Sequence, residues 1–382
     1  MGKNWGNLIL FFSFIYLLTI IILNKQLYSK KFNFSQFEKK YYSSQWAIPH
    51  SKNVISDEDL YAYAGFKYIK GLNPIHLAPE VPPLGKYLIG ASIYLFNNQR
   101  VASLIFTLLS LAVIYHLIYF STKSNFASSL GVLLTTLNTL FTDQIIHSPQ
   151  LDIFQLLFLL LFIILFMVYR KTNSRIYFFS SGLAFGYFIS TKFFLLSFLI
   201  INLTLVLYFL ISKTRMIKSF IELTFLNVIS LAVYMFTYVG FFMYGGSFRG
   251  FLGVQKWILQ FYSSSTIDIT KLLGNYLSLI FFNRYRFWSE GYPIIHYQYW
   301  SFFWPIIFIL ALFSAYYLVI SKEYKKNDLV IFMFSFLIIY NLLLFVTPIY
   351  PRYLLLLFVP LNILIAIYIS KIIHRKISIF KF

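Results

Sequence analysis

The chain has 382 residues, of which 59% are hydrophobic, 22% aromatic and 12% charged, and its formal net charge is +20. Soluble domains are about 45–50% apolar and about 25% charged, so this composition excludes a soluble enzyme, a disordered tail and a nucleic-acid-binding domain. Several apolar runs reach the roughly 18–20 residues that cross a bilayer as a helix. The chain is therefore expected to be an integral membrane protein. It contains no cysteine, which excludes disulfides and thiolate metal sites.

The apolar runs predict an all-α polytopic membrane protein with about ten transmembrane helices. The predicted spans are 8–23, 100–120, 126–142, 151–169, 176–190, 193–211, 219–244, 299–320, 329–346 and 353–370. The third and fifth runs are short, so counts of nine and eleven stay open. No small-residue cleavage site follows the first run, which is interpreted as an uncleaved span.

This pattern divides the chain into five parts. They are a first transmembrane helix (1–23), a first outer loop with acidic residues (24–99), helices 2–7 (100–244), a second outer loop rich in aromatics (245–298), and helices 8–10 with a basic tail (299–382).

The distribution of positive charge in the short loops predicts the orientation. With the N-terminus in the cytoplasm, the short outer loops hold Lys192 and Arg352, whereas the other short-loop lysines and arginines lie inside. Both termini are then cytoplasmic and both long stretches are outside. Most of the 12 acids also fall on the outer face, which is where chemistry is expected.

The stretch after residue 55 is the most informative for function. Ser56 precedes three adjacent acids, Asp57, Glu58 and Asp59, and then a segment with helical character. Ser56 or Asp57 is suited to cap that helix, but three carboxylates exceed what a cap requires. They fit either a general base tuned by its acidic neighbours or a divalent cation site with oxygen ligands.

Other ionisable residues lie near the predicted outer ends of the apolar spans. They are Glu80, Lys86, Arg100, His147, Asp152, Lys192 and Arg352. Each one alone fits an interfacial anchor, and a lysine such as Lys86 can extend to the membrane surface. Together on one face they favour a site for an anionic partner such as a phosphate.

These stretches, in this order, resemble the GT-C superfamily of integral-membrane glycosyltransferases, and most of all its protein O-mannosyltransferase branch. The matching elements are Asp57-Glu58, a Pro-Pro-Leu-Gly-Lys motif at 82–86 with Val81 where the family has histidine, Arg100, a Ser-x-x-Leu-Asp element at 148–152, a Gly-x-x-x-Gly-x-x-x-Ser-x-Lys element at 182–192, and the aromatic and Arg segment at 350–357. The resemblance covers residues 50–195 well and 345–370 weakly.

The resemblance implies transfer of a mannose-like hexose from a polyprenyl- or dolichyl-phosphate donor to a hydroxyl acceptor on protein, lipid or glycan, with inversion. It assigns the catalytic roles to Asp57 and Glu58, with Asp57 as the base and Glu58 either positioning the acceptor or tuning Asp57. The expected ligands of the donor phosphate are Arg100, Lys86, Lys192 and Arg352, and the expected supporting residues are His147, Asp152, Asp59 and Glu80. The segment 245–298 is too short for the large lumenal domain of eukaryotic members, which indicates a minimal prokaryotic-type member.

Two other functions stay open from the sequence, namely a transporter or flippase for a lipid-linked or anionic substrate and a non-catalytic scaffold. Transporters place their sites near the membrane midplane on paired repeats, and no internal repeat is evident here. The resemblance implies no required metal or cofactor, although Asp57, Glu58 and Asp59 leave a divalent cation open. The expected location is the plasma membrane of a prokaryote, with membrane lipids as further partners and no nucleic acid.

Overall fold

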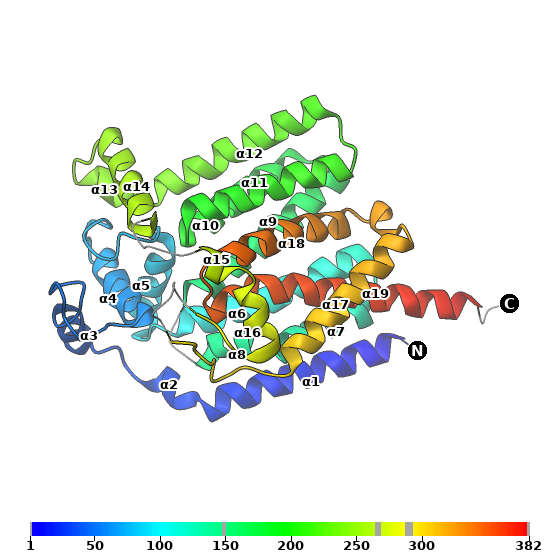
Figure 1. Cartoon of the computed structure of the whole chain (residues 1–382), viewed down its shortest axis with the longest axis horizontal. Helices are drawn as coiled ribbons and strands as arrows, with labels where there is room; N and C mark the ends of the chain where they lie inside the picture. Colours follow the sequence, from blue (N-terminus) through cyan, green and yellow to red (C-terminus); the bar gives the residue numbers. More distant parts are fainter. Residues whose placement is uncertain (1, 147–149, 264–268, 287–292, 380–382) are drawn as a thin grey trace.

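The protein is a bundle of long helices (Figure 1), seen here in a computed structural model that describes residues 2–146, 150–263, 269–286 and 293–379. Within these ranges there is no β-strand, and one isolated bridge joins Tyr285 and Ile295. Among the described residues, eight helices are long and apolar enough to cross a membrane. They are α1 (Gly2–Leu23), α6 (Val101–Thr122), α9 (Leu151–Thr172), α11 (Phe194–Ile211), α12 (Met216–Phe236), α17 (Phe303–Ile320), α18 (Asp328–Val346) and α19 (Leu355–Ile379). The all-α polytopic class predicted from the sequence is thus confirmed.

The helices differ from the predicted spans in three places, two of which are the short spans. Residues 126–142 form two helices, α7 (Asn125–Thr136) and α8 (Thr139–Ile146), because the chain breaks at Asn138, whose side chain accepts a hydrogen bond from the Leu140 amide. Residues 176–190 form α10 (Arg175–Thr191), one residue shorter than the shortest spanning helix. The predicted span 219–244 also ends early, since α12 stops at Phe236 and the short α13 (Val239–Met243) follows.

The described parts of the two long stretches 24–99 and 245–298 are largely helical. The first contains α2 (Lys25–Ser29), α3 (Phe34–Tyr42), α4 (Asp57–Ile69) and α5 (Leu84–Phe96). The second contains α14 (Phe248–Ser263), α15 (Ile269–Leu272) and α16 (Asn275–Phe282). Helices α3, α4, α5, α13 and α14 gather at one end of the bundle, and both chain termini lie at the other end (Figure 1). Two single-turn 3-10 helices, η1 (Glu323–Lys326) and η2 (Pro351–Leu354), lead into α18 and α19.

Helices α4 and α5 touch backbone to backbone. A Cβ atom on Gly65 would overlap the carbonyl oxygen of Lys86, and one on Gly90 would overlap the carbonyl oxygen of Gly65. Glycine is the residue that permits such close approach. This contact fixes the first turn of α4 relative to the rest of the bundle.

The core of the bundle runs along α9 and α19. In the most apolar stretch of each spanning helix, 78% of the residues are buried in α9 and 83% in α19. These are the highest shares among the eight helices. Asp152 lies in the first turn of α9, and Arg352 lies in η2 directly before α19. The best-packed helices of the protein therefore position these two charged side chains.

Candidate active site

The first turn of α4 distributes its three carboxylates in different directions. Ser56, one of the two predicted caps, is the N-cap of α4. Its side chain accepts a hydrogen bond from the Asp59 amide at 3.3 Å. Asp57 and Glu58 face Arg352, whereas Asp59 forms an ion pair with Lys40 at 2.6 Å. Acids in a first helical turn are favoured by the helix dipole, so the local sequence supports this arrangement.

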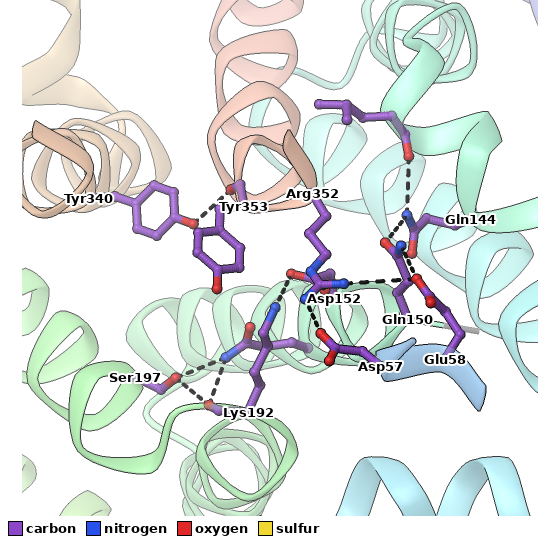
Figure 2. A network of polar contacts seen from close by, with 12 residues as sticks. Asp57, Glu58, Gln144, Gln150, Asp152, Lys192, Ser197, Tyr340, Arg352 and Tyr353 are labelled. Atoms are coloured by element: carbon purple, nitrogen blue, oxygen red, sulfur yellow. Dashed lines mark hydrogen bonds and ion pairs between the residues drawn. The ribbon is translucent and has the colours of Figure 1, made fainter. Parts of the chain in front are cut away.

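Arg352 lies among three carboxylates from two distant helices (Figure 2). Its Nη2 is in direct contact with Asp57 Oδ2, its Nη1 lies 3.9 Å from Glu58 Oε1, and its Nε lies 3.6 Å from Asp152 Oδ2. The planar fork of a guanidinium group is suited to such multiple contacts with carboxylates. Arg352 thus connects α4 with the core of the bundle.

Lys192 is the second cation of this cluster. It lies in the break between α10 and α11, and its Nζ contacts Asp152 Oδ1 at 2.7 Å. The break has an extended Lys192 followed by Phe193 at φ 46°, and Gln155 and Ser197 hydrogen-bond to the Lys192 carbonyl oxygen at 3.2 and 2.8 Å. The ammonium also lies 4.4 Å from the ring centre of Tyr353, a cation–π distance.

Exposure separates the three acids of the cluster. The side chain of Asp57 is 45% exposed, that of Glu58 is 20% exposed and that of Asp152 is 3% exposed. Asp57 is therefore the carboxylate that an entering molecule can reach, and Asp152 acts on the two cations from within. A small cavity opens at this point, lined by Asp57, Glu58, Tyr61, Gln150, Leu151, Asp152, Lys192 and Arg352.

Lys86 and Glu80 are both buried and lie apart from the Arg352 cluster. Lys86 is fully buried and does not extend to the surface, because its Nζ donates to the carbonyl oxygens of Ala78 and Val81, the latter at 2.8 Å. Burial raises the pKa of Glu80 to about 7, against the opposing positive charge of Lys86. The Lys86 ammonium is held by the loop before α5 and does not join the Arg352 cluster.

Arg100 lies in a second pocket. The pocket has a volume of about 110 Å³ and is lined by Lys30, Lys31, Asn33, Gln36, Phe37, Lys40, Asp59, Gln99 and Arg100. Asp59 and Arg100, both predicted for one site with Asp57, are thus on the other side of the first turn of α4. His147, another predicted supporting residue, lies outside the described residues.

The three adjacent acids do not share one ligand position. Asp57 and Glu58 contact Arg352, and Asp59 contacts Lys40. In the described part of the chain, no group of three or more His, Cys, Asp or Glu side chains is arranged to hold a metal ion. A metal requirement stays untested.

Several side chains of the cluster were missed from the sequence. Gln150 donates from Nε2 to Glu58 Oε1 at 2.8 Å, Gln144 donates to Gln150 at 3.3 Å, and Tyr353 packs under Lys192. Gln150 and Tyr353 are neighbours of Asp152 and Arg352 inside the two matching elements, and that adjacency was an available signal. Gln144 carries no comparable signal.

Residues 80–239 match the sequence model of the family described as dolichyl-phosphate-mannose-protein mannosyltransferase. No curated protein sequence matches the chain. The matched segment contains Arg100, Asp152 and Lys192, but neither Asp57 nor Arg352.

Three solved structures share the fold. ArnT from Cupriavidus metallidurans in the apo state matches with a TM-score of 0.55 and 15% identity, over 82% of this chain and 55% of that one. The same protein bound to undecaprenyl phosphate matches with a TM-score of 0.54 and 14% identity, over 96% and 60%. The apo oligosaccharyltransferase from Archaeoglobus fulgidus matches with a TM-score of 0.57 and 12% identity, over 99% and 52%.

The present chain therefore spans little more than half the length of each of these structures. These matches give no support to the transporter alternative. The family match and the shared helical architecture agree with the resemblance seen in the sequence. The chain thus shares the fold of these structures, and residues 80–239 match the model of the dolichyl-phosphate-mannose-protein mannosyltransferase family.

Proposed function

We propose that the protein transfers a sugar from a polyprenyl-phosphate donor to a hydroxyl acceptor. The observation that carries this proposal is the contact of an exposed carboxylate, Asp57, with the buried cation Arg352 in a small cavity at one end of the bundle. One of the similar structures, ArnT, binds undecaprenyl phosphate, which is a lipid of the proposed donor class.

In the proposed reaction Asp57 accepts the proton of the acceptor hydroxyl. The hydroxyl oxygen forms a bond to the anomeric carbon of the donor sugar while the bond from that carbon to the phosphate oxygen breaks. The electron pair of the broken bond stays on the lipid phosphate. Attack opposite to the leaving phosphate inverts the anomeric carbon.

The negative charge on the departing phosphate requires nearby cations. Arg352 and Lys192 are the best-supported ligands, because both line the cavity that also contains Asp57. Asp152 contacts both cations and orients them, and Glu58 contacts Arg352 and accepts a hydrogen bond from Gln150. Lys86 is less favoured, since the carbonyl oxygens of its own loop occupy its ammonium.

The finer features of the reaction are also proposals. We infer a hexose such as mannose as the sugar, an acceptor hydroxyl on protein, lipid or glycan, and no required metal. The basic short loops favour a cytoplasmic location for both termini and an outer location for the Arg352 cluster, in the plasma membrane of a prokaryote.

The test is sugar transfer by the purified full chain in detergent, with polyprenyl-phosphate mannose or glucose as donor, with and without EDTA. We expect turnover in the wild type, its loss in Asp57→Asn and Arg352→Gln, and its retention in Glu323→Gln, which lies in η1 away from the cavity. Retention with EDTA is expected if no metal is needed. Full turnover of Asp57→Asn would contradict the assigned base, and a wild type that transfers from neither donor would contradict the proposed sugar class.

A further inference from the structure

The second pocket carries an excess of positive charge. Lys30, Lys31, Lys40 and Arg100 line it, and Asp59 is the acid among its lining residues. Asp59 is in contact with Lys40 at 2.6 Å and also interacts electrostatically with Arg100, so a single acid faces four cations. A pocket with this charge attracts an anion of more than one negative charge.

The walls of the pocket are held in place by buried polar contacts. The Asn98 side-chain amide donates to the carbonyl oxygens of Leu27, Tyr28 and Lys30 at 2.9, 3.0 and 2.9 Å. The Phe32 amide donates to the Asn97 carbonyl oxygen at 2.8 Å. These bonds hold the backbone of the segment with Lys30 and Lys31 against the start of α6, where Arg100 lies, so the three basic residues are kept at one pocket.

The floor of the pocket is buried, and its rim is exposed. Phe37 is 8% exposed and stacks on Phe32 at a ring-centre distance of 4.6 Å, and Gln99 is 6% exposed. The lysines Lys30, Lys31 and Lys40 are exposed at the rim. The cavity volume of about 110 Å³ lies below the about 300–1,000 Å³ of sites for drug-sized ligands, so the pocket suits a small group such as a phosphate.

We propose that this pocket binds a phosphate-type oxyanion other than the leaving phosphate of the sugar donor. The two anion positions are separate, because Asp57 and Glu58 turn toward Arg352 whereas Asp59 turns toward Lys40. The binding site does not depend on the proposed transfer reaction. If that reaction occurs, the pocket holds a phosphate-bearing group beside the helical turn that carries Asp57.

The oxyanion has two sources, which are the headgroup of a membrane phospholipid and a phosphate group on a water-soluble or acceptor molecule. Both present the same chemistry to the lysines and Arg100. The experiment separates them by changing the lipid around the protein.

The first measurement is the thermal unfolding of the purified full chain in nonionic detergent, titrated with inorganic pyrophosphate. A ligand that binds the folded state raises the unfolding temperature in a saturable way. We expect saturable stabilisation of the wild type and a Kd at least about tenfold weaker in the double variant Lys30→Gln/Lys31→Gln, since each loses a charge-assisted contact.

The matched control is Lys25→Gln/Lys39→Gln. It removes the same charge from the neighbouring helices α2 and α3, and neither lysine lines the pocket. We expect this control to bind pyrophosphate like the wild type. Arg352→Gln is expected to retain the binding as well, because Arg352 belongs to the other cavity.

The second measurement repeats the titration in nanodiscs of phosphatidylcholine or phosphatidylglycerol. Weaker pyrophosphate binding in phosphatidylglycerol would identify a lipid headgroup as the oxyanion, and equal binding in both would identify a soluble or acceptor phosphate.

Lys31→Glu, which reverses one exposed charge, serves as a second variant if the double variant does not fold. Equal affinities in the pocket and control variants, no saturable stabilisation of the wild type, or loss of binding in Arg352→Gln alone would overturn the proposal. None of these outcomes depends on sugar transfer.

Discussion

Two charged clusters of similar composition lie at opposite ends of α9. At its first turn, Asp152 belongs to the cluster of Arg352, Lys192, Asp57 and Glu58. At its last turn, Arg170 contacts Glu222 Oε2 at 3.3 Å, Tyr169 donates to Glu222 Oε1 at 2.7 Å, and Lys218 lies 3.7 Å from Glu222 Oε1. Each cluster combines an arginine, a lysine and a tyrosine with buried acid.

The balance of charge and exposure differs between the two clusters. Glu222 is a single acid, 6% exposed, with three partners, so its charge is fully compensated inside the fold. The Arg352 cluster has three acids for two cations, and Asp57 is 45% exposed. A buried acid with all its partners holds helices together, whereas an exposed acid next to a buried cation is able to act on another molecule. Composition alone does not distinguish these two roles.

The largest expected effect comes from removing the acid of each cluster. Asp57→Asn should lower sugar transfer by about 10²–10⁴-fold, the contribution of a general base. Glu222→Gln should leave the turnover of the folded molecule unchanged and lower the unfolding temperature, because Arg170 and Lys218 lose their acid. Transfer assays on monodisperse protein, with thermal unfolding in parallel, measure both. A similar loss of turnover in the two variants would remove the distinction.

The second effect concerns the two arginines. Arg352→Gln leaves two mostly buried acids without their shared cation and should cost about 3–5 kcal/mol of stability as well as turnover. Arg170→Gln leaves Glu222 with Tyr169 and Lys218 and should cost about 1–2 kcal/mol, with turnover retained. Unfolding temperatures of both variants give the order. A greater loss of stability in Arg170→Gln would contradict it.

The third effect is a pH dependence that belongs to Lys192. Burial lowers the pKa of Lys192 to about 8, against the opposing charge of Asp152. Above that pH the Lys192 ammonium loses its proton, and the site then lacks one of the positive charges that stabilise the leaving phosphate. The rate of transfer should therefore fall as the pH rises through about 8. Lys192→Arg should remove this fall, since arginine stays protonated.

Stability should change in the opposite direction over this range. The unfolded chain, with an ordinary lysine pKa of 10.5, binds more protons than the folded chain between about 8 and 10.5, so the Lys192 contribution to stability rises with pH there. A fall in transfer without unfolding therefore distinguishes titration of the site from denaturation. Lys218→Arg at the other cluster should leave the pH profile unchanged.

The smallest effect comes from one hydrogen bond in each cluster. Gln150→Ala removes the donor to Glu58 and should lower transfer by about three- to tenfold, the equivalent of roughly 1 kcal/mol. Tyr169→Phe removes the donor to Glu222 and should change the unfolding temperature without changing transfer. Steady-state rates and unfolding curves of the two variants are the measurement. A rate loss in Tyr169→Phe would show that the two ends of α9 are coupled.

Much of the fold was predictable because it depends on neighbouring residues. Long apolar runs must form helices in a bilayer, where backbone groups have no water to pair with. The same local logic predicted the Ser56 cap and the break at Lys192 between two helices. It was less accurate where an apolar run is interrupted, as at Asn138, because a single capping side chain ends a helix without changing the hydropathy around it.

The candidate site divides in the same way. The sequence by itself determined that Asp152, Lys192 and Arg352 are ionisable residues at the ends of apolar spans, where charge is costly and indicates function, and that Asp57 belongs to an acidic cluster. Only the tertiary structure decided their partners, since Asp57 and Arg352 are 295 residues apart and meet where the first turn of α4 lies next to η2. It also separated Arg100 and Asp59 from Asp57, because successive residues in a helical turn point to different sides. Which side chains a charge meets depends on helix packing, and that information is not contained in any local stretch of the chain.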